Sequence, residues 1–340
     1  MPARSLIIQT SFLGDTVLTT PLIARLAERT QVDIVVTPLS APLLANNPAI
    51  HEVIVYDKRG ADRGFGGLVR LAGRLRRNGY AAAYHAQGSV RSATLSLLAR
   101  IGKRVGFVTS AGHRFYTTQV PYIENEHHAE RLLRLAGEGS STGTPRPKLF
   151  PGDPEREAVD TLLREAGWNG VDPLIAVAPG SVWATKRWPF YAELAEQVAG
   201  HVVVIGSGAD RELTLQVAAA AAGRVIDATG KLSLLASAEL IARSAVLVTN
   251  DSAPLHLASA MGTPTAAIFG PTVPEFGFGP LASRSSVLGN DSLACRPCDR
   301  HGPQRCPLGH WRCMREITPR HVAMAVQALL APSPPPTSQP

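Results

Sequence analysis

The segment that most constrains this chain is residues 247–271, LVTNDSAPLHLASAMGTPTAAIFGP. An apolar run ends at Asn250-Asp251-Ser252, a helical pattern follows, and a second apolar run ends at Gly270-Pro271. This order of strand, helix and strand predicts one step of a parallel α/β sheet. Such sheets bind ligands at the carboxyl ends of their strands, and a helix N-terminus there attracts phosphate. The segment therefore predicts a nucleotide or sugar-phosphate site.

The same alternation of strands and helices runs along both halves of the chain. The first half predicts strands and helices in these ranges: strands Leu6–Thr10, Val32–Thr37, Val53–Tyr56, Tyr80–His85 and Arg104–Val108, with helices Val17–Arg29 and Gly66–Arg77. The second half predicts strands Leu174–Ala178, Val202–Ile205, Val225–Asp227, Val246–Thr249 and Thr265–Phe269, with helices 190–199, 209–222, 232–243 and 252–261. This pattern is typical of an α/β protein with doubly wound parallel sheets.

We expect two Rossmann-like domains, at residues 1–150 and 151–330, that face each other across a central cleft. A chain of 340 residues is long enough for two hydrophobic cores. The stretch Gly137–Pro154 is rich in Gly, Ser, Thr and Pro, which is typical of a linker. The Pro- and Ser-rich residues 331–340 are expected to be a disordered tail.

The formal net charge of +7 favours an anionic partner: nucleic acid, an acidic membrane surface or a phosphorylated ligand. No basic patch interleaved with aromatic residues is present, which disfavours nucleic acid. The first residues lack the apolar run of a signal peptide, and no apolar run is long enough to span a membrane. We therefore expect a cytoplasmic protein.

Gly14-Asp15 follows the first expected strand, at the point where a helix begins. Because Asp is a favoured N-cap residue, a purely structural role is one interpretation of Asp15. The other is a general base at the carboxyl edge of the first sheet.

A similar loop, Ala178–Pro189, follows the first strand of the second half. Gly180 and Ser181 could offer backbone N–H groups and a hydroxyl to a phosphate, and Lys186 and Arg187 could supply positive charge to a phosphate leaving group. The alternative is a loop with solvated cations above a packed tryptophan.

Two further strand ends carry polar residues. Ser252 is typical of an N-cap, which puts His256 near the start of a helix, where the helix dipole disfavours its protonation. A lone helical histidine is more often structural, but its place after Asp-Ser favours ligand binding. The segment 204–212 contains an incomplete dinucleotide glycine motif, so an oxidoreductase is disfavoured, and Asp210 or Glu212 could hydrogen-bond a ribose.

All four cysteines lie between residues 295 and 313: Cys295, Cys298, Cys306 and Cys313. A Cys-x-x-Cys pair with two further thiols matches the composition of a tetrahedral zinc site, although a second Cys-x-x-Cys pair is absent. His301 and His310 are alternative ligands. Stable disulfides are not expected in the cytoplasm. A structural zinc site and unliganded thiols therefore remain, as equal interpretations.

Taken together, these motifs resemble glycosyltransferase family 9, the ADP-heptose:lipopolysaccharide heptosyltransferases. The resemblance spans roughly residues 5 to 330 in unbroken order. The segments that carry it are Gly14-Asp15 with Thr19-Thr20-Pro21, Pro179-Gly180-Ser181 with Lys186-Arg187-Trp188-Pro189, Thr249-Asn250-Asp251-Ser252 with His256, Gly270-Pro271-Thr272 with Pro274-Glu275-Phe276, and Ile317-Thr318-Pro319. The Lys-Arg-Trp-Pro and Pro-Glu-Phe segments look most like the heptosyltransferase II branch.

The resemblance implies a GT-B fold, with the acceptor in the N-terminal domain and the nucleotide-sugar in the C-terminal domain. It also implies inversion at the anomeric carbon, with no cofactor or metal required for catalysis. Asp15 would be the base, and Lys186 and Ser181 would bind the leaving diphosphate. The donor pocket would be lined by Gly14, Ser181, Asp251, Ser252, Ala253 and His256, with Asp210 or Glu212 at the ribose.

Two features depart from the family pattern. Ala253-Pro254 stands where these enzymes often carry Gly-Leu, and the cysteine cluster is not part of their best-known pattern. These departures bear on the sugar and the acceptor and not on the reaction type.

The leading hypothesis is a transferase that moves heptose from ADP-heptose to a lipopolysaccharide inner-core acceptor at the inner face of the inner membrane. Arg70 and Arg74, on the basic helix, could contact a phosphorylated lipid acceptor, or that helix face is simply solvated. One alternative is a related family 9 transferase with another nucleotide-sugar or acceptor. A remote one is a non-catalytic nucleic-acid-binding protein.

Overall fold

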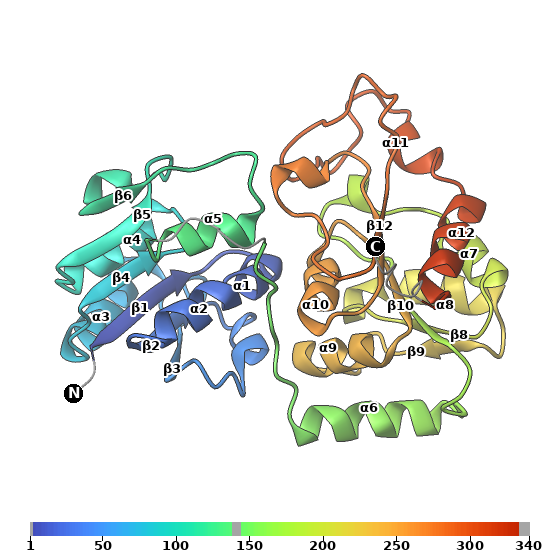
Figure 1. Ribbon diagram of the computed structural model, residues 1–340, viewed down its shortest axis with the longest axis horizontal. Coiled ribbons are helices and arrows are strands. Elements are labelled where there is room, and N and C mark those ends of the chain that lie inside the picture. Colours follow the sequence, from blue (N-terminus) through green and yellow to red (C-terminus); the bar gives the residue numbers. More distant parts are fainter. Residues whose placement is uncertain (1–2, 138–143, 333–340) are drawn as a thin grey trace, which may run out of the picture. The chain divides into compact units, whose positions relative to one another are not determined.

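The computed structural model describes residues 3–137 and 144–332. The chain divides into two compact units, an N-terminal unit, Met1–Gly152, and a C-terminal unit, Asp153–Pro340. Each unit contains a six-stranded sheet with helices packed against it (Figure 1). Residues 138–143 of the expected linker and residues 333–340 of the expected tail lie outside the described part of the chain.

The sheet of the N-terminal unit has the strand order β3-β2-β1-β4-β5-β6, and all its strands are parallel. The order reverses between β1 and β4, which is the position at which parallel α/β sheets bind ligands at their carboxyl edge. The strands are β1 (Arg4–Gln9), β2 (Gln31–Val36), β3 (Glu52–Val55), β4 (Ala82–His85), β5 (Lys103–Phe107) and β6 (Thr118–Val120).

The helices of this unit lie on both sides of its sheet. Successive residues of a strand point to opposite faces, so Ile7 packs in one apolar cluster while Leu6 and Ile8 pack in another. Burial on both faces explains why the strands are continuous apolar runs. The helices are α1 (Leu13–Leu18), α2 (Thr20–Ala27), α3 (Gly64–Arg77), α4 (Val90–Leu98) and α5 (His128–Arg134), with short 3₁₀ turns η1 (Ala41–Leu44) and η2 (His113–Phe115).

The prediction of one helix over Val17–Arg29 was wrong. Two helices, α1 and α2, meet at Thr19. Pro21 is responsible, because its ring has no N–H to donate and would clash with the carbonyl of residue 17 in a continuous helix. The Thr20 hydroxyl donates a hydrogen bond to that carbonyl oxygen, Val17 O, at 2.8 Å.

The C-terminal unit repeats the topology, with strand order β12-β11-β10-β7-β8-β9 and all strands parallel. The order reverses between β7 and β10. Its strands are β7 (Leu174–Ala178), β8 (His201–Val204), β9 (Val225–Asp227), β10 (Val246–Asn250), β11 (Thr265–Ile268) and β12 (Ser285–Leu288). The five predicted strands are confirmed to within one residue at each end, and β12 was not predicted.

The helices predicted for the second half are confirmed as α7 to α10. The full set is α6 (Asp153–Glu165), α7 (Tyr191–Gln197), α8 (Arg211–Ala220), α9 (Leu234–Arg243), α10 (Ala253–Met261), α11 (Arg312–Arg315) and α12 (Pro319–Leu330), with 3₁₀ turns η3 (Ala184–Lys186), η4 (Gly208–Asp210) and η5 (Pro274–Phe276). No helix in the described ranges combines the length and the apolar character needed to cross a bilayer.

Candidate functional site

The strongest constellation lies at the carboxyl edge of the C-terminal sheet, where β7 and β10 are neighbours. The loop 179–190 leaves β7, and Asp251-Ser252 leaves β10 and leads into α10. Because the strand order reverses here, the fold itself brings these two loops together. The sequence-predicted residues Lys186 and Asp251 therefore meet, although they lie 65 positions apart.

Lys186 and Asp251 form a largely buried ion pair. The Nζ atom of Lys186 lies 2.6 Å from Oδ2 of Asp251, and the two residues are 8% and 9% exposed. The hydroxyl of Thr272, after β11, donates to the same oxygen at 2.7 Å. Lys186 is thus held at the sheet edge and is not the solvated cation of the alternative interpretation. An ammonium has three N–H donors, so it can bind a second anion while Asp251 keeps it in place.

Asn250, the last residue of β10, ties the same two loops together and was not among the predicted site residues. Its Nδ2 donates to Pro179 O at 2.9 Å, and its Oδ1 accepts from Trp188 N at 3.1 Å and Tyr191 OH at 3.2 Å. The side chain is fully buried. Asn250 therefore fixes the path of the loop that carries Lys186.

Gly180 and Asp210 are in direct contact, which explains why residue 180 is glycine. A Cβ atom on Gly180 would lie 2.4 Å from Asp210 Oδ1. The Oδ2 atom of Asp210 accepts hydrogen bonds from Ser207 N at 2.9 Å and Ser207 Oγ at 2.8 Å. Asp210 thus caps its own turn beneath the 179–190 loop, whereas Glu212 is an exposed residue of α8.

The start of α10 differs from the prediction in one detail. Ser252 occupies the N-cap position, but its side chain makes no capping hydrogen bond, and its hydroxyl lies 3.4 Å from Asn250 O. The same hydroxyl lies 3.5 Å from Thr249 Oγ1, so it contacts the end of β10 instead of the helix. Ala253 and Pro254 form the first turn, and a helix start without a side-chain cap leaves N–H groups for an anion.

His256 lies in the second turn of α10 and is buried. Its ring packs against the edge of Phe278, with ring centroids 6.2 Å apart. Ser181, at the other side of the site, accepts a 3.3 Å hydrogen bond from Trp183 N, and its carbonyl accepts one from Arg187 Nε at 2.8 Å. Ser181 and Arg187 thus stiffen the loop before Lys186.

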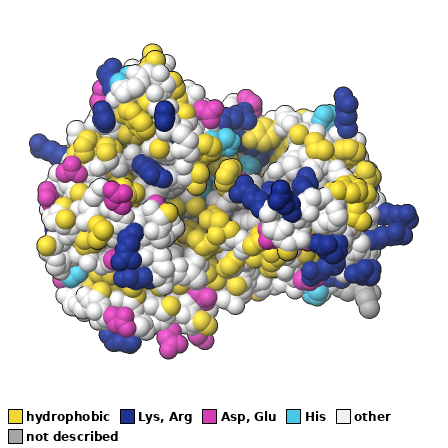
Figure 2. Space-filling model, turned by 180° about the vertical axis from the view of Figure 1, so that it is seen from behind, with side chains coloured by type: hydrophobic (Ala, Val, Ile, Leu, Met, Phe, Trp, Pro, Cys, Tyr) yellow, Lys and Arg dark blue, Asp and Glu magenta, His cyan; other side chains and the backbone are white. Residues whose placement is uncertain are grey.

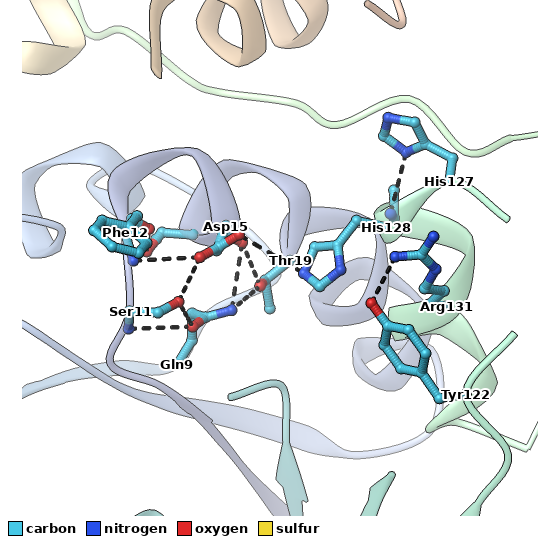
Figure 3. A network of polar contacts seen from close by, with 11 residues as sticks. Gln9, Ser11, Phe12, Asp15, Thr19, Tyr122, His127, His128 and Arg131 are labelled. Atoms are coloured by element: carbon cyan, nitrogen blue, oxygen red, sulfur yellow. Dashed lines mark hydrogen bonds and ion pairs between the residues drawn. The ribbon is translucent and has the colours of Figure 1, made fainter. Parts of the chain in front are cut away.

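In the N-terminal unit, Asp15 lies in the first turn of α1, at the carboxyl edge beside β1 (Figure 3). The N-cap residue is Phe12, not Asp15, because Asp15 is the third helical residue and bonds back to the cap. Its Oδ2 accepts from Ser11 Oγ at 2.7 Å and Phe12 N at 3.3 Å. Gln9 lies 2.6 Å from the Ser11 hydroxyl and continues the network to Thr19 Oγ1, at 3.0 Å.

His128, the first residue of α5, points at the other carboxylate oxygen of Asp15. Its Nε2 lies 3.8 Å from Asp15 Oδ1, and both side chains are mostly buried. Burial lowers the pKa of His128 below its ordinary value, and the Asp15 charge only partly offsets this. No sequence pattern predicted His128, because it lies 113 positions after Asp15 and only the fold brings the two side chains together.

Arg70 and Arg74 were predicted to contact an acceptor, and both make ion pairs on or near α3. Arg70 bonds Asp62 at 3.3 Å, and Arg74 bonds Glu52 at 2.6 Å. Glu52 begins β3, so Arg74 lies at the amino edge of the sheet, the opposite edge from Asp15. At the carboxyl edge, Lys58 Nζ instead donates to Thr10 O at 2.7 Å.

The four cysteines are all free thiols. Cys295 Sγ lies 3.9 Å from His310 Nε2, whereas the His301 ring stacks on Trp183, with ring centroids 6.1 Å apart. Among the described side chains, no three or more His, Cys, Asp or Glu are gathered as they stand into a group that could hold a metal ion.

The chain is similar to known proteins over most of its length. The model of glycosyltransferase family 9 (heptosyltransferase) matches residues 68–309. Lipopolysaccharide heptosyltransferase 1 of Pseudomonas aeruginosa is 29% identical over 96% of this chain and 98% of its own. The family 9 glycosyl transferase structure from Veillonella parvula has a TM-score of 0.86 at 24% identity, covering 96% of this chain and 97% of its own.

Escherichia coli ADP-heptose lipopolysaccharide heptosyltransferase II has a TM-score of 0.78 at 25% identity, covering 96% of this chain and 98% of its own. These likenesses confirm the predicted GT-B fold class. Because the family model covers more than half of the sequence, the chain belongs to glycosyltransferase family 9, the heptosyltransferase family, and is an enzyme that transfers a sugar.

Proposed function

We propose that this enzyme transfers a heptose from ADP-heptose to the inner core of lipopolysaccharide, with inversion at the anomeric carbon and without a catalytic metal. The names of its relatives support the sugar and the acceptor, since they are lipopolysaccharide heptosyltransferases 1 and 2. The observation that supports binding of the nucleotide-sugar donor in the C-terminal unit is the Lys186–Asp251 pair beside the uncapped start of α10.

The diphosphate of the donor would bind at the start of α10 and at the Lys186 ammonium. As the bond between the anomeric carbon and the diphosphate oxygen breaks, its electron pair leaves with ADP, and the leaving group gains negative charge. A fixed cation and a helix N-terminus stabilise that charge without having to reorganise. Asp251 serves this step by holding the ammonium in position. Ser181 would bind the diphosphate together with Lys186, and Ala253 and His256 would line the donor pocket.

Asp15 would accept the proton of the acceptor hydroxyl, whose oxygen forms the new bond to the anomeric carbon. Its Oδ2 is occupied by Ser11 and Phe12, so Oδ1 is the oxygen that would take the proton. His128, held largely neutral by burial, faces that oxygen and would orient it. Inversion requires that the acceptor oxygen attack the face of the sugar opposite to the departing diphosphate. No step calls for a metal, so a zinc ion at the cysteines would be structural.

The distribution of positive charge along the chain supports the proposed anionic acceptor. Residues 1–152 contain 19 Lys and Arg against 10 Asp and Glu, whereas residues 153–340 contain 15 against 17. Figure 2 shows Lys and Arg side chains gathered on the N-terminal unit, at the right of the view. An excess of cations attracts anionic lipid and a phosphorylated acceptor. We therefore propose that the enzyme works at the cytoplasmic face of the inner membrane.

Nucleotide binding tests whether the donor is ADP-heptose or another nucleotide-sugar. Calorimetry with ADP, UDP and GDP is expected to show tight binding of ADP alone. Ala253-Pro254, in place of the more usual Gly-Leu, is the feature that favours the alternative. A preference for UDP or GDP would support that alternative, and failure of all three nucleotides to bind would contradict the transferase mechanism.

A further inference from the structure

The four cysteines line one pocket of the C-terminal unit. This pocket has a volume of about 280 Å³, and its wall is completed by Pro297, Pro307, Leu308 and His310. Cys313 is buried in the core, Cys295 and Cys306 are half-buried and Cys298 is exposed. The four sulfurs thus differ in their exposure to solvent but line the same pocket. They belong to a segment with little regular secondary structure.

The pocket offers hydrogen-bond donors to its sulfurs. The backbone N–H groups of residues 308–311 hydrogen-bond the Cys306 sulfur. His310 Nδ1 accepts a 3.1 Å hydrogen bond from Arg312 N, so the proton of the neutral ring is on Nε2. That N–H faces Cys295 Sγ at 3.9 Å. His310 is therefore a donor to a sulfur rather than a metal ligand, and His301, stacked on Trp183, is not a ligand either.

We propose that Cys295, Cys298, Cys306 and Cys313 bind one zinc or iron ion as a tetrahedral four-thiolate site. Four sulfur ligands select these two metals. Hydrogen bonds from backbone amides and from a histidine to the sulfurs are the outer contacts that such sites use. The side chains are not yet gathered into a binding group, so the ion would draw them together as it binds, as metals commonly do in small loop-rich segments.

The segment between the proposed ligands also braces both loops of the donor site. Gln304 donates from Nε2 to Val182 O at 3.0 Å and accepts from Ala184 N at 3.2 Å. Cys298 N donates to Pro271 O at 2.8 Å, next to Thr272. A metal that fixes this segment would therefore also fix the loops that carry Lys186 and Thr272. This coupling rests on the proposed function, whereas the metal site itself does not.

Metal content tests the site directly. Protein purified without chelator from cells supplied with zinc, and separately with iron, is expected to contain about one metal ion per chain. Cys298→Ser and Cys306→Ser should lose it, while Arg305→Ser, an exposed neighbour outside the pocket, should keep it. Wild-type protein that stays metal-free under both supplies, or a Cys298→Ser variant with wild-type metal content, would overturn the proposal.

Cobalt substitution keeps the test decisive if the cysteine variants fold poorly. Metal-free wild-type protein titrated with Co²⁺ should develop the intense thiolate-to-cobalt bands of a tetrahedral sulfur site. Zinc should then displace the cobalt and raise the thermal midpoint by roughly 5 °C. Weak bands of an octahedral ion, with no change in the midpoint, would contradict a four-thiolate site.

Gln304→Ala separates metal binding from its effect on the donor site. The variant should keep its metal, and removing that metal should weaken ADP binding less than it does in the wild type, because the contact of Cys298 N with Pro271 O remains. If the wild type binds ADP equally well with and without metal, the coupling is wrong and the metal site stands. If neither form binds ADP, the proposed function fails instead.

Discussion

Lys186 shows how a single side chain acquires a function from the partner that holds it. A lysine in a loop is ordinarily mobile and solvated, but Asp251 and the sheet edge bury this one. The sequence placed both residues at strand ends, which was enough to predict that they lie near a phosphate. Their pairing, and the role of Asn250 in holding the loop, could not be predicted, because both depend on strand order. His128 was missed for the same reason.

We predict that Lys186→Met weakens ADP binding by about tenfold to a hundredfold, the value of a hydrogen bond to a charged group. The variant should also be less stable, because it leaves the Asp251 carboxylate buried without its cation. The double variant Lys186→Met with Asp251→Asn should recover stability but not affinity. Calorimetry and thermal unfolding measure the two effects, and Arg320→Met, at an exposed position of α12, is the control. Recovery of affinity in the double variant would show that Lys186 only balances Asp251.

His85 gives a prediction about pH. Burial, with a smaller effect of Arg104, lowers its pKa from 6.5 to about 3, so the folded protein holds it neutral. The unfolded chain binds that proton more readily, and stability therefore falls as the pH drops from 6.5 towards 3. The expected slope from this residue is about 1.4 kcal/mol per pH unit. His85→Gln should flatten the unfolding free energy in that range, whereas the exposed His321→Gln should not. Equal slopes in all three proteins would contradict this account.

At the scale of elements, the sequence predicted most strands because they are buried on both faces and therefore continuously apolar. The unpredicted strands β6 and β12 are edge strands of three and four residues with exposed polar positions. Their strand conformation comes from pairing with β5 and β11, not from their own pattern. The break between α1 and α2 depends on Pro21, which the apolar periodicity alone does not register. The two strands were thus missed because pairing with a neighbouring strand decides their conformation, whereas the helix break is a local effect of Pro21.

The contact between Gly180 and Asp210 predicts a selective effect of one methyl group. Gly180→Ala would place Cβ 2.4 Å from Asp210 Oδ1, so the Asp210 turn or the loop must shift. We expect a loss of stability of about 1–3 kcal/mol and weaker ADP binding, because the shifted loop carries Lys186. Gly208→Ala is the matched control, since nothing lies within 4 Å of its Cβ position. Urea unfolding and calorimetry measure both quantities, and equal behaviour of the two variants would show that the loop adapts freely.

At the scale of the whole molecule, the two units share one strand order but differ in charge. The excess of Lys and Arg lies in residues 1–152, while residues 153–340 are nearly balanced. The net charge predicted an anionic partner, and the charge distribution indicates that this partner contacts residues 1–152. The helix predicted to meet the acceptor directs Arg74 to the amino edge of the sheet instead.

This charge distribution predicts binding to anionic membranes. The protein should co-sediment with vesicles containing phosphatidylglycerol, and not with phosphatidylcholine alone, at low ionic strength. Binding should fall as salt rises, because exposed charges are screened beyond about 10 Å at 0.1 M salt. Equal binding to neutral vesicles, or binding that salt does not change, would contradict an electrostatic contact.

The most direct test of heptosyl transfer is product analysis with ADP-heptose and a lipopolysaccharide acceptor that lacks heptose. The wild type should add one heptose with inverted anomeric configuration and release ADP, in buffer with no added divalent metal ion. Asp15→Asn keeps an acceptor for Ser11 and Phe12, so it should bind ADP-heptose normally but transfer at least a hundredfold more slowly. No product from the wild type, a retained configuration, or equal transfer by Asp15→Asn would contradict the proposed mechanism.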